Sequence, residues 1–537
     1  MGNILKNKTY LYLTEFFSGM SVMAVELAAS RLMAPYFSSS QIVYTIIIGT
    51  VMIAMALGNI YGGKTADKNP DPAILYRRML IAAAWMAAIP FVGRYVIIAI
   101  SGVLVLSVNT NFLIIAAFVS CMVVFVFPLF LLGTVTPSLV RYIMENTEES
   151  GEIVGRLGAF NTVGSIIGTF LPTFVTIPAV GTAATFVIFS GILLVLAALY
   201  FISIKKVTKA MVISVIVFLL CSIFGTKVSF AFWDPELMYE GESVYNYLQV
   251  DDQEDRIILS TNVLFGVQSV KMKTDGLTRM YYDYAFSGGA AAREQKKSDE
   301  PLDILILGNG TGTFATQCAK YYKGCRIDGV EIDGKISRLA YDYFDMSDEV
   351  NLYEYDGRAF LEAIDNKYDV ILVDAYQDIT IPFQMSSLEF FTLVRDHLNK
   401  NGVMVVNMNM HSDGEGAINE YLADTIARVF DNIYMADVGS NSNRELFACN
   451  GFDYKESLKK AFDISKYGGV LVNQLKKVES GLVKFEGTGH DYLLTDDKAP
   501  VEVLGMSMID SLISEEIEYY QGVYKEEGLK GLIEGLL

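Results

Sequence analysis

Seven apolar stretches in the first 230 residues constrain the fold of this 537-residue chain more than any other feature. A helix that crosses a bilayer needs roughly 20 mostly apolar residues, and each stretch reaches that length. We therefore expect residues 1–230 to form an all-α transmembrane bundle of about seven spans, surrounded by a lipid bilayer. The stretches are approximately 10–34, 41–63, 79–101, 112–140, 158–178, 183–204 and 210–230.

Charge divides the chain at the same place. Residues 1–230 contain 14 Lys and Arg against 8 Asp and Glu, a net charge of +6. Residues 231–537 contain 28 Lys and Arg against 53 Asp and Glu, a net charge of −25. Basic loops are typical of membrane proteins, whereas the acidic remainder disfavours nucleic acid as a partner and is compatible with a cationic substrate.

The basic residues of the bundle are expected to gather on its cytoplasmic side. If the N-terminus lies inside, that side receives nearly all of them, and the opposite side receives none from its three loops between helices. Seven spans would then put the following domain outside the cytoplasm, where nucleoside cofactors are scarce. The sequence thus predicts a multi-pass protein of the cell membrane and leaves open the side of the soluble domain. The residues are Lys6, Lys8, Lys64, Lys68, Arg77, Arg78, Arg141, Arg156, Lys205, Lys206 and Lys209.

Two acids and one glycine pattern stand out within the apolar stretches. Glu15 and Glu26 are eleven residues apart, which puts them on nearly the same face of a helix. Either they form a cation-attracting or proton-linked stripe inside the bundle, or Glu15 lies at the membrane interface and Glu26 pairs with Arg94 of a neighbouring helix. Gly164 and Gly168 form a small-xxx-small pattern, which indicates close helix packing more often than dimerisation.

Residues 231–537 have the pattern of a soluble α/β protein. Residues 231–290 are expected to form short β-strands, with a turn at Asp275-Gly276. From residue 291 onward, apolar strands at 304–307, 327–330, 370–373 and 403–406 alternate with helical segments, and another strand is expected at about 351–355. Buried parallel strands separated by helices predict a doubly wound, Rossmann-like sheet in residues 291–537. Ligands of such sheets bind beyond the carboxyl ends of the strands.

Four successive strands of this domain end in residues suited to bind a nucleoside. The first is followed by a glycine-rich turn, which lets the backbone approach a ligand closely. The second is followed by an acid that can accept both ribose hydroxyl hydrogen bonds, and no phosphate-binding Lys is present, which argues against a P-loop enzyme. The set suits a nucleoside sulfonium, as in S-adenosylmethionine-dependent enzymes. In chain order the residues are Gly308, Gly310 and Gly312, then Glu331, then Asp356 with Gly357, then Asp374.

Several motifs together resemble one family. Residues 240–505 look like the polyamine aminopropyltransferases, or spermidine synthases, in the form fused to an N-terminal multi-span helical module. The implied fold is a small β-strand region followed by a Rossmann-like domain of the S-adenosylmethionine methyltransferase type. The motifs are Glu242-Ser-Val-Tyr-Asn, Thr274-Asp-Gly, Ile304-Leu-Ile-Leu-Gly-Asn-Gly-Thr-Gly, Val330-Glu-Ile-Asp, Tyr355-Asp-Gly-Arg, Tyr368-Asp-Val-Ile-Leu-Val-Asp-Ala-Tyr and Leu494-Thr-Asp-Asp-Lys-Ala-Pro-Val-Glu.

The resemblance implies a reaction and a role for each strand-end residue. An aminopropyl group would pass from decarboxylated S-adenosylmethionine (S-adenosylmethioninamine) to putrescine or a similar amine, and methylthioadenosine would leave. The donor is a co-substrate, and no tightly bound cofactor is implied. Glu331 would bind the ribose, Asp356 with Gly357 the adenine side, and Asp374 would be the catalytic acid–base residue. Asn246 falls where the family usually has a Gln that touches the nucleoside.

The chain departs from the family pattern where the amines bind. Thr311 stands where the glycine loop usually carries an Asp that holds the substrate amines. The second Asp of the catalytic loop is replaced by Gln377, with Asp378 one step later. The Tyr-His pair expected before the glycine loop is absent, and the nearest aromatic pair is Tyr281-Tyr282. Thr311, Asp378 and Tyr282 are the candidate substrate-binding residues.

Two other functions stay open at this level. The same scaffold could serve a methyltransferase that uses S-adenosylmethionine, or a non-catalytic nucleoside- or polyamine-binding domain that regulates a membrane transporter module. The 5 Cys and 3 His have no metal-ligand spacing, so no metal site is expected. The sequence is compatible with a homo-oligomer and leaves the oligomeric state open.

Overall fold

The computed structural model describes residues 4–37, 39–105, 108, 111–144, 150–225, 229–232, 236–263, 267–296, 300–375, 381–409, 414–439 and 443–505, with residues 514, 517, 519, 521–523 and 525–526. The chain divides into two compact units, which are described separately. Unit 1 comprises Met1–Pro235 and Ile513–Leu537, and unit 2 comprises Glu236–Leu512.

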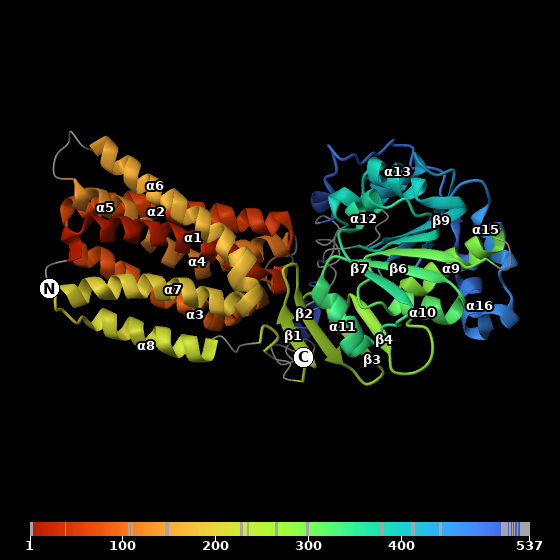
Figure 1. The fold of residues 1–537 in the computed structure, drawn as a ribbon, viewed down its shortest axis with the longest axis horizontal. Coiled ribbons are helices and arrows are strands. Elements are labelled where there is room, and N and C mark those ends of the chain that lie inside the picture. Colours follow the sequence, from red (N-terminus) through yellow and green to blue (C-terminus); the bar gives the residue numbers. More distant parts are fainter. Residues whose placement is uncertain are drawn as a thin grey trace. The chain divides into compact units, whose positions relative to one another are not determined.

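Unit 1 is a bundle of long apolar helices that alternate in direction (Figure 1). A short 3-10 helix, η1 (Ile4–Lys6), precedes the bundle, and a π-helical turn, η3 (Pro172–Thr176), joins two of its members. The helices are α1 (Lys8–Phe37), α2 (Gln41–Lys68), α3 (Pro72–Val105), α4 (Phe112–Gly133), α5 (Val135–Ile143), α6 (Ser150–Leu171), α7 (Ile177–Ser203) and α8 (Lys209–Phe224).

The number of long apolar segments differs from the prediction of seven. Within the described residues, five helical segments are long and apolar enough to cross a membrane. The stretches expected at 158–178 and 183–204 lie in one helical run of 53 residues, Gly151–Ser203, because no polar loop separates them. Gly181 interrupts this run, with φ 82° and ψ 169°. Helix α8 has only 16 residues, fewer than the roughly 20 that a span needs.

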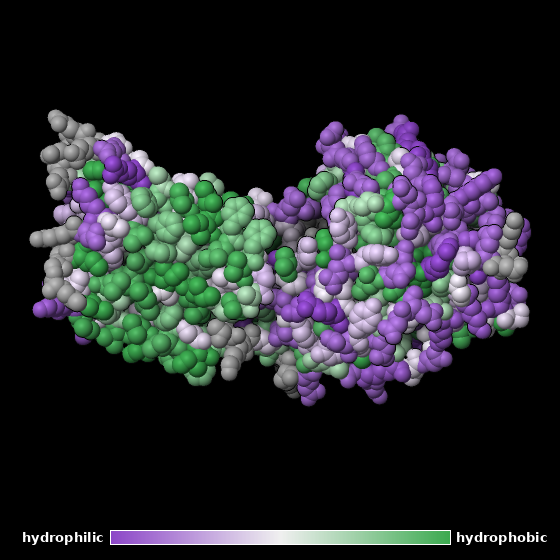
Figure 2. Space-filling model, viewed as in Figure 1, coloured by the Kyte–Doolittle hydropathy of each residue, from purple (hydrophilic) through white to green (hydrophobic). Residues whose placement is uncertain are grey.

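The outer surface of unit 1 is apolar over most of the face that Figure 2 shows. Large apolar side chains exposed on this unit include Met52, Ile60, Phe170, Ile213 and Leu219. A surface of this kind is unfavourable in water and is expected where lipid or another protein covers it. Because the helices alternate in direction, the N-terminus lies at the same end of the bundle as the α2–α3, α5–α6 and α7–α8 connections (Figure 1).

Glycines bring two pairs of helices into backbone contact. A Cβ atom on Gly164 or Gly168 of α6 would collide with the carbonyl oxygens of Phe16 and Met20 in α1. In the same way, a Cβ atom on Gly58 of α2 would collide with the backbone of α4. Small residues allow such close approach in apolar bundles, so close helix packing is confirmed for the Gly164–Gly168 pattern.

Glu15 lies inside the bundle, among three helices. Its Oε1 accepts hydrogen bonds from Thr136 Oγ1 of α5 at 2.5 Å and from Asn161 Nδ2 of α6 at 2.8 Å. Its Oε2 is buried and has no hydrogen-bond partner in the part of the chain that the structure describes. Three helices therefore enclose this carboxyl group, and its depth in a membrane stays a prediction.

Glu26 does not pair with Arg94. The guanidinium of Arg94 instead donates hydrogen bonds to the carbonyl oxygen of Ser229 and to the hydroxyl of Tyr95. The proposed Glu26–Arg94 pair is wrong, since Arg94 is already held by residues at one end of the bundle.

Unit 2 begins with a small antiparallel sheet. Its strands follow each other in chain order, and Val250 of the second faces Leu259 of the third. The short strands predicted in this region are confirmed, although a helix, α9 (Tyr282–Gln295), already begins within it. The strands are β1 (Tyr239–Glu242), β2 (Tyr247–Asp252), β3 (Arg256–Ser260) and β4 (Ser269–Met272).

The main sheet of unit 2 has the order β12-β10-β11-β9-β8-β5-β6-β7. Strands β5 to β9 are parallel, which confirms the predicted doubly wound sheet, and β11, β10 and β12 extend it in antiparallel fashion. The strands are β5 (Asp303–Leu307), β6 (Arg326–Glu331), β7 (Val350–Glu354), β8 (Tyr368–Val373), β9 (Leu398–Met408), β10 (Asn432–Asp437), β11 (Arg444–Cys449) and β12 (Val483–Lys484).

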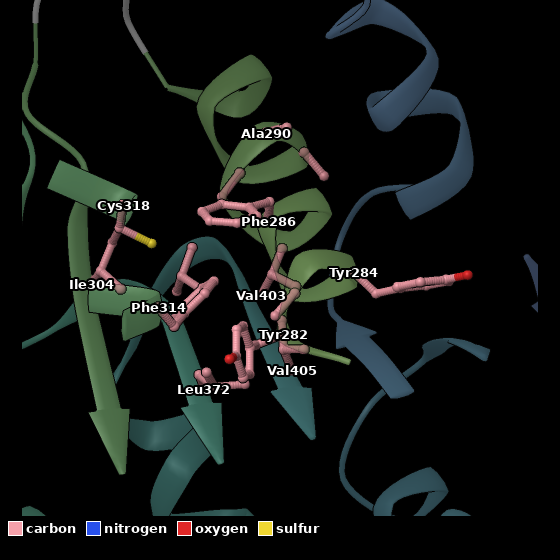
Figure 3. Close-up of a cluster of buried hydrophobic side chains, with 14 of the residues drawn as sticks. Tyr282, Tyr284, Phe286, Ala290, Ile304, Phe314, Cys318, Leu372, Val403 and Val405 are labelled. Atoms are coloured by element: carbon pink, nitrogen blue, oxygen red, sulfur yellow. The ribbon is translucent and has the colours of Figure 1, made fainter. Parts of the chain in front are cut away.

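Helices cover both faces of this sheet. One face packs against α9, α10, α15 and α16, and the other against α12, α13 and α14. On the first face, Phe286 of α9 lies against Phe314 of α10, with ring centroids 5.0 Å apart (Figure 3). The remaining helices are α10 (Thr313–Tyr321), α11 (Gly334–Phe344), α12 (Gly357–Ala363), η5 (Phe383–Met385), α13 (Leu388–Asp396), α14 (Ile418–Ala427), α15 (Tyr454–Lys460) and α16 (Ile464–Gly481).

Candidate active site

The residues predicted from the strand ends lie where the strand order of the main sheet reverses. From β5 the chain forms β6 and β7 on one side and then returns to form β8 on the other side of β5. Backbone hydrogen bonds join these ends: Gly308 N donates to Val330 O at 2.9 Å, and Asp374 N donates to Leu307 O at 2.8 Å. Open α/β sheets bind ligands at such a point.

The glycine-rich turn after β5 has a backbone conformation that favours glycine. Gly308, Gly310 and Gly312 have φ values of 89°, 53° and 73°, in the left-handed region. A Cβ atom on Gly308 would collide with the carbonyl oxygen of Asp374, so the turn is in backbone contact with the end of β8. Thr311 is fully buried, and its hydroxyl oxygen lies 3.2 Å from Thr313 Oγ1. The substrate-binding role of Thr311 stays a prediction.

Glu331 ends β6 and is held by the backbone on both sides. Gly310 N donates to its Oε2 at 2.8 Å, and Asp333 N donates to its Oε1 at 3.0 Å. Burial raises the pKa of Glu331 to about 7, although these N–H groups lower it. Each carboxylate oxygen has a second lone pair, so the group can still accept hydrogen bonds from ribose hydroxyls.

Asn246 supports this acid through a neighbour. Its Nδ2 donates to Asp333 Oδ2 at 3.0 Å, and Ser243 Oγ donates to the same oxygen at 2.5 Å. The backbone N–H of Asp333 in turn donates to Glu331. Asn246 is therefore connected to Glu331 through Asp333. Its direct contact with the nucleoside stays a prediction.

Asp356 and Gly357 lie at the end of β7, beside the end of β6. Tyr355 N donates to the carbonyl oxygen of Glu331 at 3.1 Å, which joins the two strand ends. Asp356 caps helix α12, because its Oδ1 accepts from Ala359 N at 2.9 Å. Their role on the adenine side stays a prediction.

Asp374 directly follows β8 and accepts hydrogen bonds from two side chains. Tyr281 Oη donates to Oδ2 at 2.8 Å, and Asn407 Nδ2 donates to Oδ1 at 3.0 Å. Burial raises the pKa of Asp374 to about 7, against the effect of both hydrogen bonds, and the charge of Glu331 raises it further. Burial also raises the pKa of Tyr281 well above its ordinary value, which keeps this phenol a donor. A carboxyl group whose pKa lies near neutral pH is suited to accept a proton from an amine.

Tyr282 does not reach this carboxyl group. Its hydroxyl donates to the carbonyl oxygen of Val270 at 3.0 Å, and its ring belongs to the buried cluster under α9 (Figure 3). The neighbouring Tyr281 contacts Asp374 instead, because successive residues of a helix point in directions about 100° apart. The substrate-binding role of Tyr282 stays a prediction, Tyr281 is the tyrosine of the pair that contacts Asp374, and Asp378 lies outside the described residues. Across the described ranges, no three His, Cys, Asp or Glu residues are placed to hold a metal ion.

The sequence reasoning missed three polar residues on the strands next to Asp374 or beside them. Asn407 follows the apolar segment 403–406, so the strand-end pattern could have found it. Asn443 Nδ2 donates to Asn407 Oδ1 at 3.0 Å, which turns the amide nitrogen of Asn407 toward Asp374. Glu445 lies opposite Asn407 on β11, and only the antiparallel register of that strand places it there.

The tyrosine pair offers a matched test. Tyr281→Phe removes one of two donors to Asp374, and kcat is expected to fall about tenfold, the value of one hydrogen bond to a charged group. Tyr282→Phe is expected to leave kcat unchanged and to lower the free energy of unfolding by about 1 kcal/mol, because the amide of Val270 loses a partner. Steady-state kinetics and thermal unfolding of both variants measure the two effects. A larger loss of kcat for Tyr282→Phe than for Tyr281→Phe would contradict the assignment.

Comparisons with known proteins agree on one family. Residues 291–438 match the family described as the spermine/spermidine synthase domain. A protein of Bifidobacterium longum (strain NCC 2705), named probable polyamine aminopropyl transferase, is 51% identical over 355 residues, which are 62% of this chain and 77% of that protein. This chain belongs to the polyamine aminopropyltransferase family.

More distant aminopropyltransferases match shorter parts. The polyamine aminopropyltransferase of Vibrio vulnificus (strain CMCP6) is 29% identical over 196 residues, 35% of this chain and 64% of that protein. The crystal structure of a probable spermidine synthase from Corynebacterium glutamicum ATCC 13032 is 21% identical, covers 45% of this chain and 94% of that chain, and gives a TM-score of 0.37. In the chain described here, the family match at residues 291–438 contains Glu331, Asp374 and Asn407. Tyr281 and Glu445 lie outside this match.

Proposed function

We propose that the chain transfers the aminopropyl group of decarboxylated S-adenosylmethionine to putrescine or a similar amine. Membership of the aminopropyltransferase family supports this reaction. The observation that carries the proposal is the placement of Asp374, whose buried carboxyl group is held by Tyr281 and Asn407 beside the glycine turn. Glu331 is proposed to bind the ribose of the donor, with Asp356 and Gly357 on its adenine side.

The reaction is a displacement at the carbon next to the sulfonium. The nitrogen lone pair of the acceptor forms the new N–C bond, the C–S bond breaks, and its electron pair neutralises the sulfur of the departing methylthioadenosine. Because the sulfonium is already a good leaving group, the protein chiefly aligns the partners and frees the amine of its proton. An amine with a pKa like that of Lys, roughly 10.4, is almost entirely protonated at neutral pH. Asp374 is proposed to hold this nitrogen and accept its proton.

Product mass tests the proposal against its two rivals. The full chain in detergent would be supplied with putrescine and either decarboxylated or ordinary S-adenosylmethionine, and the products identified by mass spectrometry. We expect spermidine and methylthioadenosine from the decarboxylated donor. Methylated putrescine from the ordinary donor would indicate a methyltransferase. Binding of methylthioadenosine without any product would indicate a non-catalytic domain.

We further propose that unit 1 crosses the cell membrane several times, with its basic end in the cytoplasm. The apolar helices and the basic residues at the N-terminal end of the bundle support this orientation. The side of the membrane on which unit 2 lies then depends on whether α8, with 16 residues, spans the membrane.

Cysteine labelling in intact cells tests this orientation. Asn69→Cys, in the connection between α2 and α3, is expected to react with a membrane-impermeant maleimide only after the cells are opened. The native thiols interfere little, because Cys121, Cys221, Cys318 and Cys449 are buried, and the half-buried Cys325 can be replaced by Ser. Labelling of position 69 in intact cells would reverse the orientation. The same assay on Val483→Cys, an exposed position of β12, reports the side of unit 2.

A further inference from the structure

Glu445 is a fully buried acid. Its side chain is 0% exposed, and neither carboxyl oxygen has a hydrogen-bond partner among the described residues. Burial raises its pKa well above the ordinary value, and the charge of Asp374 raises it further. Leaving a buried polar group unpaired is costly, and such groups in native proteins call for an explanation, such as a catalytic role or a water or ion that satisfies them.

The strand register places Glu445 in line with the proposed reaction centre. Glu445 of β11 is directly opposite Asn407 of β9, and Asn407 donates to Asp374 at the end of β8. The side chain lies on the sheet face that also carries Phe447 and Cys449, because side chains two residues apart share a face. Asp374, Asn407 and Glu445 therefore form a polar row at one edge of the sheet, with Asn407 in the middle.

The two carboxyl groups of this row have no basic side chain to balance them among the described residues. In the described parts of the chain, no Lys or Arg forms an ion pair with Asp374 or Glu445. The charge of Glu331 acts on Asp374, and the charge of Asp374 acts on Glu445, so these electrostatic effects come from groups of the same sign. Buried acids of this kind are stabilised by a cation, and the amine substrates of the proposed reaction are cations.

The spacing of the two acids suits a short diamine. Neighbouring strands lie about 4.8 Å apart, so the two steps from β8 through β9 to β11 separate the backbones of Asp374 and Glu445 by about 10 Å. An extended four-carbon diamine has nitrogens about 6 Å apart, from ordinary bond lengths. A charge-assisted hydrogen bond of about 2.8 Å at each end lets one molecule reach both carboxyl groups.

We propose that Glu445 binds the ammonium group at the far end of the amine acceptor, the end that does not attack the donor. The inference rests on the proposed aminopropyl transfer and adds to it a residue that selects diamines. It supplies an amine-binding carboxyl group from β11 in a site whose glycine turn carries Thr311. In the unliganded chain this group is closed off from water, and a charge-assisted hydrogen bond is strongest in such surroundings.

The test compares Glu445→Gln with two acceptors, putrescine and n-butylamine, which lacks the far ammonium group. For putrescine, kcat/KM is expected to fall roughly ten- to hundredfold, the value of a hydrogen bond to a charged group. For n-butylamine the loss is expected to be much smaller, because that acceptor offers Glu445 no far ammonium group and only the electrostatic effect of Glu445 on Asp374 is removed. Glu486→Gln, which removes the same charge from an exposed position, is the matched control and should change neither value. Glu445→Asp, which keeps the charge, should retain more of the preference for putrescine than Glu445→Gln.

A binding measurement gives a second readout that does not need turnover of n-butylamine. Calorimetry on the chain loaded with methylthioadenosine should show weaker putrescine binding in Glu445→Gln, with the affinity for methylthioadenosine unchanged. An unchanged affinity for putrescine, or an equal loss of kcat/KM for both acceptors, would overturn the role of Glu445. Failure of the proposed function is distinct, since the wild-type chain would then form no aminopropyl product with any acceptor.

Discussion

Asp374→Asn is expected to lower kcat by roughly 10²–10⁴-fold, the contribution of a positioned general base. The amide has the same shape as the carboxyl group and can still bond with Tyr281 and Asn407, so the fold should be retained. Methylthioadenosine should therefore bind as in the wild type, because Asp374 acts on the amine and not on the nucleoside. Single-turnover kinetics and calorimetry of the nucleoside measure the two effects separately.

The pH profile of the wild type provides the control for this prediction. Burial raises the pKa of Asp374 to about 7, and only the ionised carboxylate can accept a proton. The value of kcat/KM should therefore rise as pH increases through about 7 and fall as pH decreases below it. Because burial also raises the pKa of Glu331 to about 7, the comparison with Asp374→Asn uses kcat at saturating donor, and there the acidic limb should be absent from the residual activity of the variant. A variant with near wild-type turnover would rule out Asp374 as the base.

Glu331→Gln is expected to weaken binding of methylthioadenosine by roughly a hundredfold, since two hydrogen bonds from ribose hydroxyls lose a charged acceptor. The substitution also brings an amide NH₂ toward the N–H groups of Gly310 or Asp333, where the structure requires an acceptor. The glycine turn should loosen as a consequence.

Glu354→Gln is the matched control for this second prediction. Glu354 lies directly opposite Glu331 on the adjacent strand β7 but is exposed, so its loss should leave nucleoside affinity unchanged. Calorimetry with methylthioadenosine compares the two variants. Equal affinities of Glu331→Gln and the wild type would exclude the ribose-binding role of Glu331.

The parallel half of the sheet could be predicted because its signals are local in the sequence. Apolar strands followed by glycines or acids mark the ends of β5, β6, β7 and β8, and a parallel sheet brings such ends to one edge. Gly310 and Glu331 are joined there by a hydrogen bond, and Gly308 contacts Asp374. The structure therefore places these four residues around one edge, as their spacing predicts.

What depends on register between distant segments could not be predicted in this way. Whether Tyr281 or Tyr282 faces Asp374 depends on where α9 begins, and one residue changes the direction of the side chain. Glu445 reaches the site only because β11 pairs antiparallel with β9. The link between α6 and α7 was hidden for a related reason: a hydropathy pattern does not show that a single residue, Gly181, interrupts a helical run that no polar loop divides.

The glycine contacts of unit 1 also limit how this bundle could move. Helices α1 and α6 touch through their backbones, and so do α2 and α4. The two helices of each pair therefore have little freedom to slide past each other. We expect any opening of the bundle to separate the α1–α6 pair from the α2–α4 pair. Glu15 of α1 accepts a hydrogen bond from Thr136 of α5, and α5 directly follows α4 in the chain. A separation of α1 from α5 would break this bond and leave Glu15 with the hydrogen bond from Asn161 of α6.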